Sequence, residues 1–232
     1  MVRPSMSRPS MSRPSARSPH RPANATLPLT MMQQDIAKVL IDRGAIARRV
    51  QALAEQITRD LIAQGRAEAA DRPGADAAAA ALEITLVPVL AGSFIFVADL
   101  IRHLPMRLQI RMLAISSYPG AATQSRPAQV QRGLTNLPQT LEGRHVLIID
   151  DILDSGGTLR MAVELLKERQ PASLRTCVLL RKQRPQAMNF PVDYVAFDIP
   201  DEFIVGYGLD HNDYYRNLPD IVTLRPEVFS DL

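Results

Sequence analysis

Residues 146–159 read VLIIDDILDSGGTL, and this stretch is the most informative one in the 232-residue chain. Residues 146–149 are a branched apolar run, which is typical of a buried strand in a parallel sheet. Two carboxylates, Asp150 and Asp151, follow the run, and a third, Asp154, comes shortly after them. Four small or hydroxyl-bearing residues then lead into a helical pattern: Ser155, Gly156, Gly157 and Thr158. Such residues allow backbone N–H groups to surround a phosphate at the N-terminus of a helix.

The carboxylates restrict the ligand that this stretch can bind. They would repel a phosphate unless they hold a metal ion or bind sugar hydroxyls, so a ligand with phosphate, ribose and Mg²⁺ satisfies every group. A Walker loop needs Lys beside Thr158, where this chain has Leu159, and a dinucleotide fingerprint places its glycines before the acid. The simpler alternative is an ordinary strand-to-helix turn with solvated aspartates. It does not account for three acids, two glycines and two hydroxyls within residues 150–158.

These groups resemble the phosphoribosyl-diphosphate (PRPP) binding motif of the type I phosphoribosyltransferases. From Asp35 to Leu224 the chain is similar to the hypoxanthine/guanine phosphoribosyltransferases. The matching segments are VLAGSFIFVADLIRHL (89–104), SSY (116–118), LLRK (179–182) and FDIPDEFIVGYGLDHNDYYRNLP (197–219). The last segment distinguishes the purine enzymes from other users of PRPP. The resemblance implies an α/β type I phosphoribosyltransferase fold, with a parallel sheet flanked by helices and a small hood subdomain over the purine site.

The apolar pattern independently predicts alternating strands and helices. Strands are expected at 84–90, 108–116, 146–149, 175–180 and 192–197. Helices are expected within 36–66, over 94–104, and where Leu159, Val163 and Leu166 share a face. The first helical region carries an apolar stripe: Ile46, Val50, Leu53, Ile57 and Leu61. Residues 66–81 are expected to be an exposed insertion and 119–140 a long connection. This alternation predicts a parallel sheet whose ligands bind at the carboxyl ends of its strands.

Composition agrees with one catalytic domain, predicted at 35–232, after a disordered Arg/Pro/Ser-rich tail at 1–34. The sequence pI of 9.3 comes from this tail, because residues 1–22 carry five arginines and no acid. Without those five charges the net charge falls from +3 to −2, which argues against nucleic-acid binding. An alternative for the tail is a mis-assigned start, with initiation at Met31 or Met32.

Location and redox environment follow from two further features. No apolar run reaches the roughly 18–20 residues of a membrane span, so we expect no membrane partner. The lone cysteine, Cys177, allows no intrachain disulfide and is expected to be a small buried hydrophobe in a cytoplasmic protein.

The resemblance assigns contacts to PRPP. Asp150 and Asp151 would bind the ribose hydroxyls and Mg²⁺, and residues 155–158 would surround the 5′-phosphate. Asp150 stands where the family usually has Glu. Leu90, Ala91 and Gly92 would bind pyrophosphate through backbone amides, with a cis peptide between Leu90 and Ala91. Many relatives carry Lys at the position of Ala91, so this chain lacks one side-chain contact.

The remaining assignments concern the lid, the purine and the leaving group. Ser117 and Tyr118 would begin a lid loop that closes over the reaction centre. Lys182 would donate to the 6-oxygen of the purine, Phe203 would stack on the ring, and the backbone of Ile204 would contact its edge. Asp210 would be associated with Mg²⁺, and Arg216 would contact pyrophosphate. His211, His103 and His145 are not expected to be catalytic; the last two are expected at the surface.

The implied reaction is transfer of the 5-phosphoribosyl group from PRPP to hypoxanthine, and to guanine, giving IMP or GMP and pyrophosphate. Asp154 is the candidate general base for a purine ring proton. The family's usual state predicts a homodimer or homotetramer. Two alternatives stay open: a xanthine-preferring transferase, and a regulator that senses PRPP or nucleotide and binds RNA. The regulator would need an ordered basic surface, whereas the charge of the core is negative.

Overall fold

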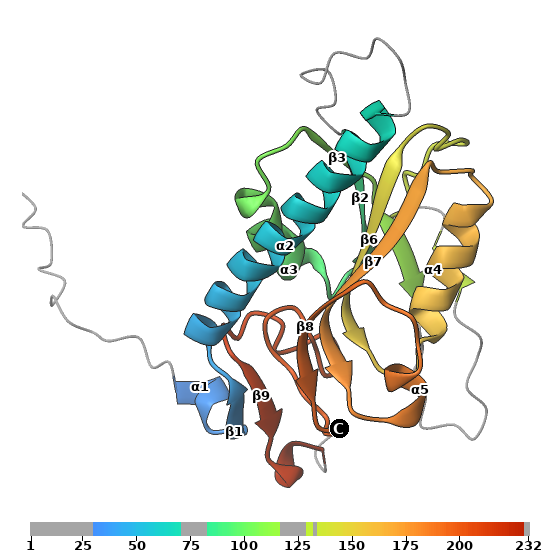
Figure 1. Ribbon diagram of the computed structural model, residues 1–232. Helices are drawn as coiled ribbons and strands as arrows, with labels where there is room; N and C mark the ends of the chain where they lie inside the picture. Colours follow the sequence, from blue (N-terminus) through green and yellow to red (C-terminus); the bar gives the residue numbers. More distant parts are fainter. Residues whose placement is uncertain (1–29, 71–82, 117–128, 132–133, 230–232) are drawn as a thin grey trace, which may run out of the picture.

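The computed structural model describes residues 30–70, 83–116, 129–131 and 134–229, and its main sheet is built around the predicted central strand (Figure 1). The strand order is β5-β4-β2-β6-β7-β8, and β3 also pairs with β2. Every pairing in this sheet is parallel except that of β4 with β5. The strands are β2 (Ile84–Leu90), β3 (Leu108–Ile110), β4 (Leu113–Ser116), β5 (Gln129–Val130), β6 (His145–Leu153), β7 (Ser173–Lys182) and β8 (Tyr194–Ile199). The predicted parallel α/β architecture is confirmed.

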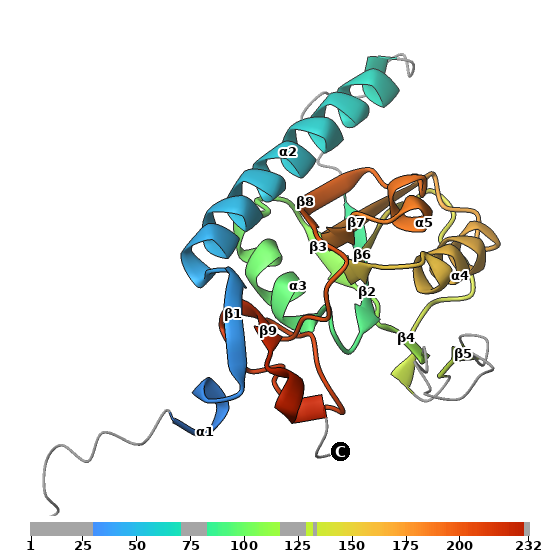
Figure 2. The same cartoon turned by 90° about the horizontal axis from the view of Figure 1, so that it is seen from below.

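Helices cover both faces of this sheet (Figure 2). α2 (Arg43–Ala70) and α3 (Phe94–Leu100), which continues as η1 (Ile101–His103), pack on one face; α4 (Gly157–Lys167) packs on the other. The alternation of β6 explains the two layers. Leu147 and Ile149 face the α2 side and Val146 and Ile148 face α4. The predicted stripe of α2 is confirmed, because its five apolar residues are all buried in the first layer.

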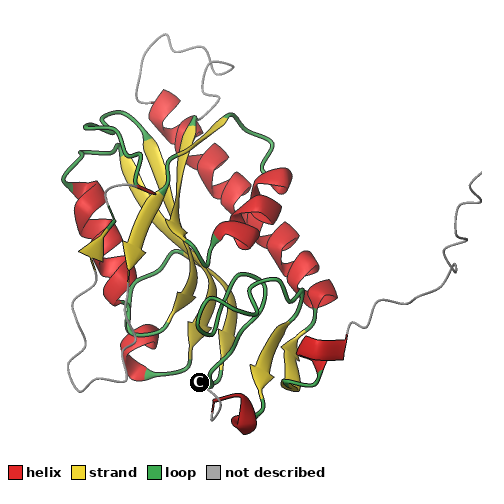
Figure 3. Ribbon diagram, turned by 180° about the vertical axis from the view of Figure 1, so that it is seen from behind, coloured by secondary structure: helices red, strands yellow, loops and turns green. Residues whose placement is uncertain are grey.

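A second, two-stranded sheet lies beside the main sheet (Figure 3). It pairs β1 (Ile36–Ile41) with β9 (Ile221–Leu224) in antiparallel orientation. Its apolar cluster contains Val205, Leu218, Val222 and Leu224. Met32, from the short helix α1 (Thr30–Gln33), packs against the same cluster. This small unit, with the loops that lead into β9, corresponds to the small subdomain expected from the resemblance.

Several local predictions were wrong, and tertiary pairing explains the differences. Residues 36–41 were expected to be helical but form β1, because β9, from the far end of the chain, supplies a partner strand. The strand predicted at 108–116 is divided into β3 and β4. Pro88 of β2, which has no N–H, lies at the level of the break, and the amide of Met112 donates to the Asn136 side chain instead (2.6 Å). β6 is longer than predicted, so Asp150 and Asp151 lie inside the strand rather than after it.

Two predictions for single side chains have opposite outcomes. Cys177 is fully buried, as expected, and burial raises the pKa of its thiol. His145 was expected at the surface but is only 6% exposed. Its Nδ1 lies 2.9 Å from Ser173 Oγ, because β6 pairs there with β7. His103 is exposed.

Other predictions concern segments that the structure does not describe. Residues 1–29 of the expected tail and 71–81 of the expected insertion lie outside the described residues, as do 119–128 and 132–133 of the long connection. Within the described part of the chain, no helix combines the length and apolar character that crossing a membrane requires. The described elements not predicted from the sequence are α1, β1, β5, β9, α5 (Pro185–Met188) and η3 (Pro226–Phe229).

Candidate active site

The predicted phosphate loop connects β6 to α4 at the carboxyl edge of the main sheet. Gly156, at the N-cap of α4, has φ +81°, a left-handed conformation that favours glycine. A Cβ at this position would also meet the Phe190 ring at 2.7 Å. Gly157 begins the helix, so the amides that follow point toward its N-terminal end. The backbone here has the arrangement that favours a bound anion.

Asp150 and Asp151 form a buried acidic pair in the last part of β6. Asp150 is 4% exposed and accepts a hydrogen bond from the amide of Asp151 (3.0 Å). Burial, and then the adjacent charge of Asp151, raise the pKa of Asp150 well above its usual range. Burial also raises the pKa of Asp151, whereas the positive charge of Arg216 acts in the opposite direction. A cation or sugar hydroxyls would stabilise this pair in its ionised form.

Two loops approach each other closely beside Asp151 of β6. The peptide between Leu90 and Ala91 is cis, as the resemblance implied. Gly92 lies directly against the Asp151 carboxylate, so a Cβ on Gly92 would collide with Oδ2. Gly208, with φ +106°, lies against the Gly92 carbonyl in the same way. The expected pyrophosphate turn is therefore held between the acidic pair and the loop before β9. Ala91 itself is exposed.

Asp210 and Arg216 lie in that same loop and contact each other. Arg216 Nη1 is 2.8 Å from Asp210 Oδ1 and donates to the carbonyl of Gly208 (2.9 Å). A second guanidinium nitrogen pairs with Asp213 at 2.9 Å. These contacts place the expected metal-associated carboxylate and the expected pyrophosphate contact on one turn, next to the Gly92 turn.

Asp154 and Lys182, which are separated along the chain, are brought together by the parallel pairing of β6 and β7. Lys182 Nζ is 3.3 Å from Asp154 Oδ2 and 3.2 Å from Asp201 Oδ1. Arg184 pairs with the other oxygen of Asp154, and its Nε lies 3.5 Å from Asp201. Two carboxylates and two cationic side chains thus alternate in a closed charge cluster, which consists of Asp154, Lys182, Asp201 and Arg184. The sequence analysis missed Asp201 and Arg184, although both lie within two residues of a strand end.

The expected purine contacts begin just after this cluster. Phe203 is 49% exposed, whereas Ile204, next to it, is 5% exposed and belongs to the main core. An aromatic ring on an anchored backbone is suitable for stacking on a planar base. Ser117 and Tyr118, the expected start of the lid, lie outside the described residues.

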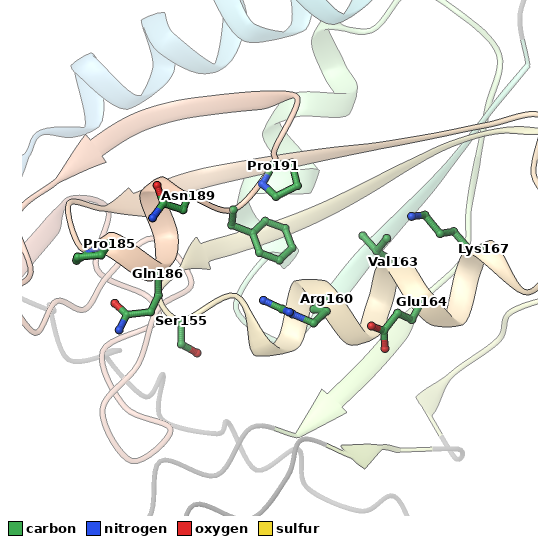
Figure 4. Close-up of a pocket in the computed structure, with 10 residues that line it drawn as sticks. Ser155, Arg160, Val163, Glu164, Lys167, Pro185, Gln186, Asn189 and Pro191 are labelled. Atoms are coloured by element: carbon green, nitrogen blue, oxygen red, sulfur yellow. The ribbon is translucent and has the colours of Figure 1, made fainter.

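A cavity of about 600 Å³ lies between α4 and α5, next to the phosphate loop (Figure 4). Its walls include Arg160, Glu164 and Phe190, and Ser155 of the predicted site also lines it. Among the described residues, none of the acidic pair or of the charge cluster lines this cavity. The cavity therefore borders the phosphate loop rather than the centre of the site.

The acidic residues fit a divalent cation that is bound mainly by its substrate. Within the described ranges, no group of three or more His, Cys, Asp or Glu side chains is arranged to hold a metal ion. Mg²⁺ commonly uses one or two protein carboxylates together with substrate phosphates and water. Asp150 and Asp151, with Asp210 in the neighbouring loop, offer donors of this kind.

Comparison with known proteins agrees with this geometry. Residues 40–212 match the family of phosphoribosyl transferase domains. The hypoxanthine-guanine phosphoribosyltransferase of Mycobacterium avium is 42% identical over 202 residues, which are 87% of this chain and 92% of that protein. The Streptococcus pneumoniae protein of the same name is 35% identical over 201 residues, covering 87% of this chain and all of the relative.

Solved structures show the same relationship. A Trypanosoma cruzi hypoxanthine phosphoribosyl transferase superposes with a TM-score of 0.71 at 36% identity, covering 85% of this chain and 96% of that one. Another T. cruzi structure, a point mutant complexed with the product IMP, has a TM-score of 0.69 at the same identity, covering 85% and 95% of the two chains. The chain therefore belongs to the hypoxanthine-guanine phosphoribosyltransferases, a family of the phosphoribosyl transferase domains.

Proposed function

We propose that this enzyme transfers the 5-phosphoribosyl group from PRPP to hypoxanthine and guanine in purine salvage. The observation that carries the proposal is the 3.3 Å contact between Asp154 and Lys182. It joins the loop that matches a phosphoribosyl site to the strand end that matches a purine site. The named relatives support this function and give no support to a xanthine preference or to an RNA-binding regulator.

In the proposed reaction a purine ring nitrogen attacks C1′ of PRPP as the bond from C1′ to pyrophosphate breaks. Asp154 takes the ring proton as the new C–N bond forms. Lys182 donates to the 6-oxygen, which favours a 6-oxo purine over the donor 6-amino group of adenine. Asp154 contacts both Lys182 and Arg184, and these contacts hold its carboxylate beside Lys182, the proposed purine contact. The same cluster would therefore orient both the general base and the purine substrate.

The phosphoribosyl end would be held by the β6–α4 loop and the neighbouring turns. Residues 155–158 would bind the 5′-phosphate through backbone amides, and Asp150 and Asp151 would bind the ribose hydroxyls. Mg²⁺, when bound, would neutralise charge on the pyrophosphate leaving group. Asp210 would face that ion, while Arg216 and the backbone of residues 90–92 would hold pyrophosphate.

Three further parts of the proposal lie beyond these contacts. The β1–β9 unit would be the hood over the purine side of the site. Ser117 and Tyr118 would begin the lid that limits hydrolysis of PRPP. The functional assembly would be a homodimer or homotetramer, which light scattering of the purified protein would test.

The decisive experiment measures pyrophosphate release with PRPP, Mg²⁺ and each purine base in turn. We expect pyrophosphate release with hypoxanthine and guanine and weak or absent release with adenine. The reason is that Lys182 donates a hydrogen bond and therefore requires an acceptor at position 6 of the purine. Faster turnover with xanthine than with either expected base would contradict the proposed substrates. Binding of PRPP with no turnover on any base would favour the regulator. Chelation of the divalent cation should abolish release, and added Mg²⁺ should restore it.

A further inference from the structure

Three aromatic rings meet where the expected purine-stacking residue lies. The ring centroids of Phe203 and His211 are 5.4 Å apart, and those of Phe203 and Phe229 are 5.3 Å apart. His211 and Phe229 complete the triangle at 5.1 Å. Interplanar angles of 84°, 86° and 68° make all three contacts edge-to-face, the geometry that the ring quadrupoles favour.

The triangle joins parts of the chain that are distant in sequence. Phe203 follows β8, His211 belongs to the turn that carries Asp210 and Arg216, and Phe229 ends η3 near the C-terminus. The backbone of Phe203 is anchored by its buried neighbour Ile204. Its half-exposed ring makes edge-to-face contacts with both of the other rings. Those two contacts restrict the plane that Phe203 presents.

His211 carries a second indication of a packing role. Its Nε2 is buried and, among the described residues, has no hydrogen-bond partner. Burying a polar nitrogen without a partner is unfavourable, so the position depends on the shape of the ring rather than on its hydrogen bonds. A phenylalanine would keep the ring and remove the buried nitrogen.

We propose that His211 and Phe229 are positioning residues that orient the Phe203 ring for stacking, which makes η3 a structural part of the purine site. The inference rests on the proposed function through the stacking role of Phe203. A ring held in its binding orientation loses less conformational freedom when the base binds. When one of the two supporting rings is removed, Phe203 gains rotameric freedom. The purine then binds to the smaller fraction of enzyme molecules in which the Phe203 ring is correctly oriented.

The test compares paired variants in the full-length protein. Phe229→Ala and His211→Ala remove one supporting ring each, whereas Phe229→Tyr and His211→Phe keep it. Loss of one of the two ring contacts of Phe203 should raise KM for hypoxanthine about 3- to 10-fold. The KM for PRPP should stay within about twofold and kcat should change little, because neither ring is expected to contact the reacting atoms. The ring-retaining variants should have the hypoxanthine KM of the unmodified protein.

The outcomes separate this inference from the proposed function. An unchanged hypoxanthine KM in both alanine variants overturns the inference, and so does an equal rise in the KM values for PRPP and hypoxanthine. Failure of the ring-retaining variants to restore the KM also overturns it. If Phe229→Ala does not fold, as judged by circular dichroism, the His211→Ala and His211→Phe pair decides. Absence of turnover by the unmodified protein with every base would contradict the proposed function instead.

Discussion

Replacing Asp154 with Asn tests the chemical role at the centre of the site. The amide keeps the shape of the side chain but cannot accept the purine ring proton, so kcat should fall by about 10²- to 10⁴-fold. The fold should survive, because the Asp154 carboxylate is 43% exposed and exposed ion pairs contribute only about 0–1 kcal/mol to stability. Steady-state rates with hypoxanthine and saturating PRPP give kcat, and the KM for PRPP should change little.

Asp201 supplies a matched control within the same charge cluster. Its carboxylate is 44% exposed and pairs with the same two cations, Lys182 and Arg184. Asp201→Asn therefore removes the same charge from the same cluster without removing the proposed base. Its kcat should stay within about tenfold of the unmodified protein, well above the loss expected for Asp154→Asn. Equal losses of kcat in the two variants, or normal turnover of Asp154→Asn, would refute the general-base assignment.

Three further predictions concern stability and the pyrophosphate turn. Gly208→Ala should destabilise the fold by about 1–3 kcal/mol and raise the KM for PRPP, because φ is +106° and the new Cβ meets the Gly92 carbonyl; thermal unfolding and kinetics check both effects. Leu53→Ala should cost about 2–5 kcal/mol in the free energy of unfolding, measured in urea, since Leu53 lies on the core-facing side of α2 and is fully buried. The hydrogen bond from Arg43 lowers the pKa of Asp220. This pair therefore stabilises the fold fully at a pH above the ordinary Asp pKa of about 3.9, and the stabilisation is lost as the pH falls through the lower pKa of the folded state. Urea unfolding should accordingly separate Asp220→Asn from the unmodified protein at neutral pH, and the difference should vanish in strong acid; a difference independent of pH would contradict this linkage.

The local pattern was sufficient wherever one element's own residues decide its structure. The 84–90 strand was predicted with the bounds that β2 has, and the stripe of α2 identified the face it buries. In both cases apolar periodicity reports burial directly. The pattern failed for β1 because IAKVLI contains apolar residues at spacings that suit a helix or a strand. Only β9, from the far end of the chain, decides between them.

Residues that contact the predicted site but were not predicted from the sequence share a similar cause. Arg184 and Asp201 are charged residues near strand ends, a common place for solvated side chains. Their relevance appears only when the parallel register of β6, β7 and β8 brings them to Asp154 and Lys182. Phe229 was missed because nothing in its neighbourhood along the chain relates it to Phe203. Such contacts depend on register and packing, which local sequence does not encode.

The sequence by itself indicated the kind of ligand, and its resemblance to a family indicated the chemistry. VLIIDDILDSGGTL places acids, small residues and hydroxyls in one run, and no distant residue is needed to see a site for phosphate and ribose. The tertiary structure decided which residues from other parts of the chain lie beside that run. It buries the acidic pair against Gly92, places Asp154 beside Lys182, and brings Phe229 to the Phe203 ring. The physical reason is that a turn's conformation follows from its own residues, whereas distances between loops are determined by the sheet that holds them.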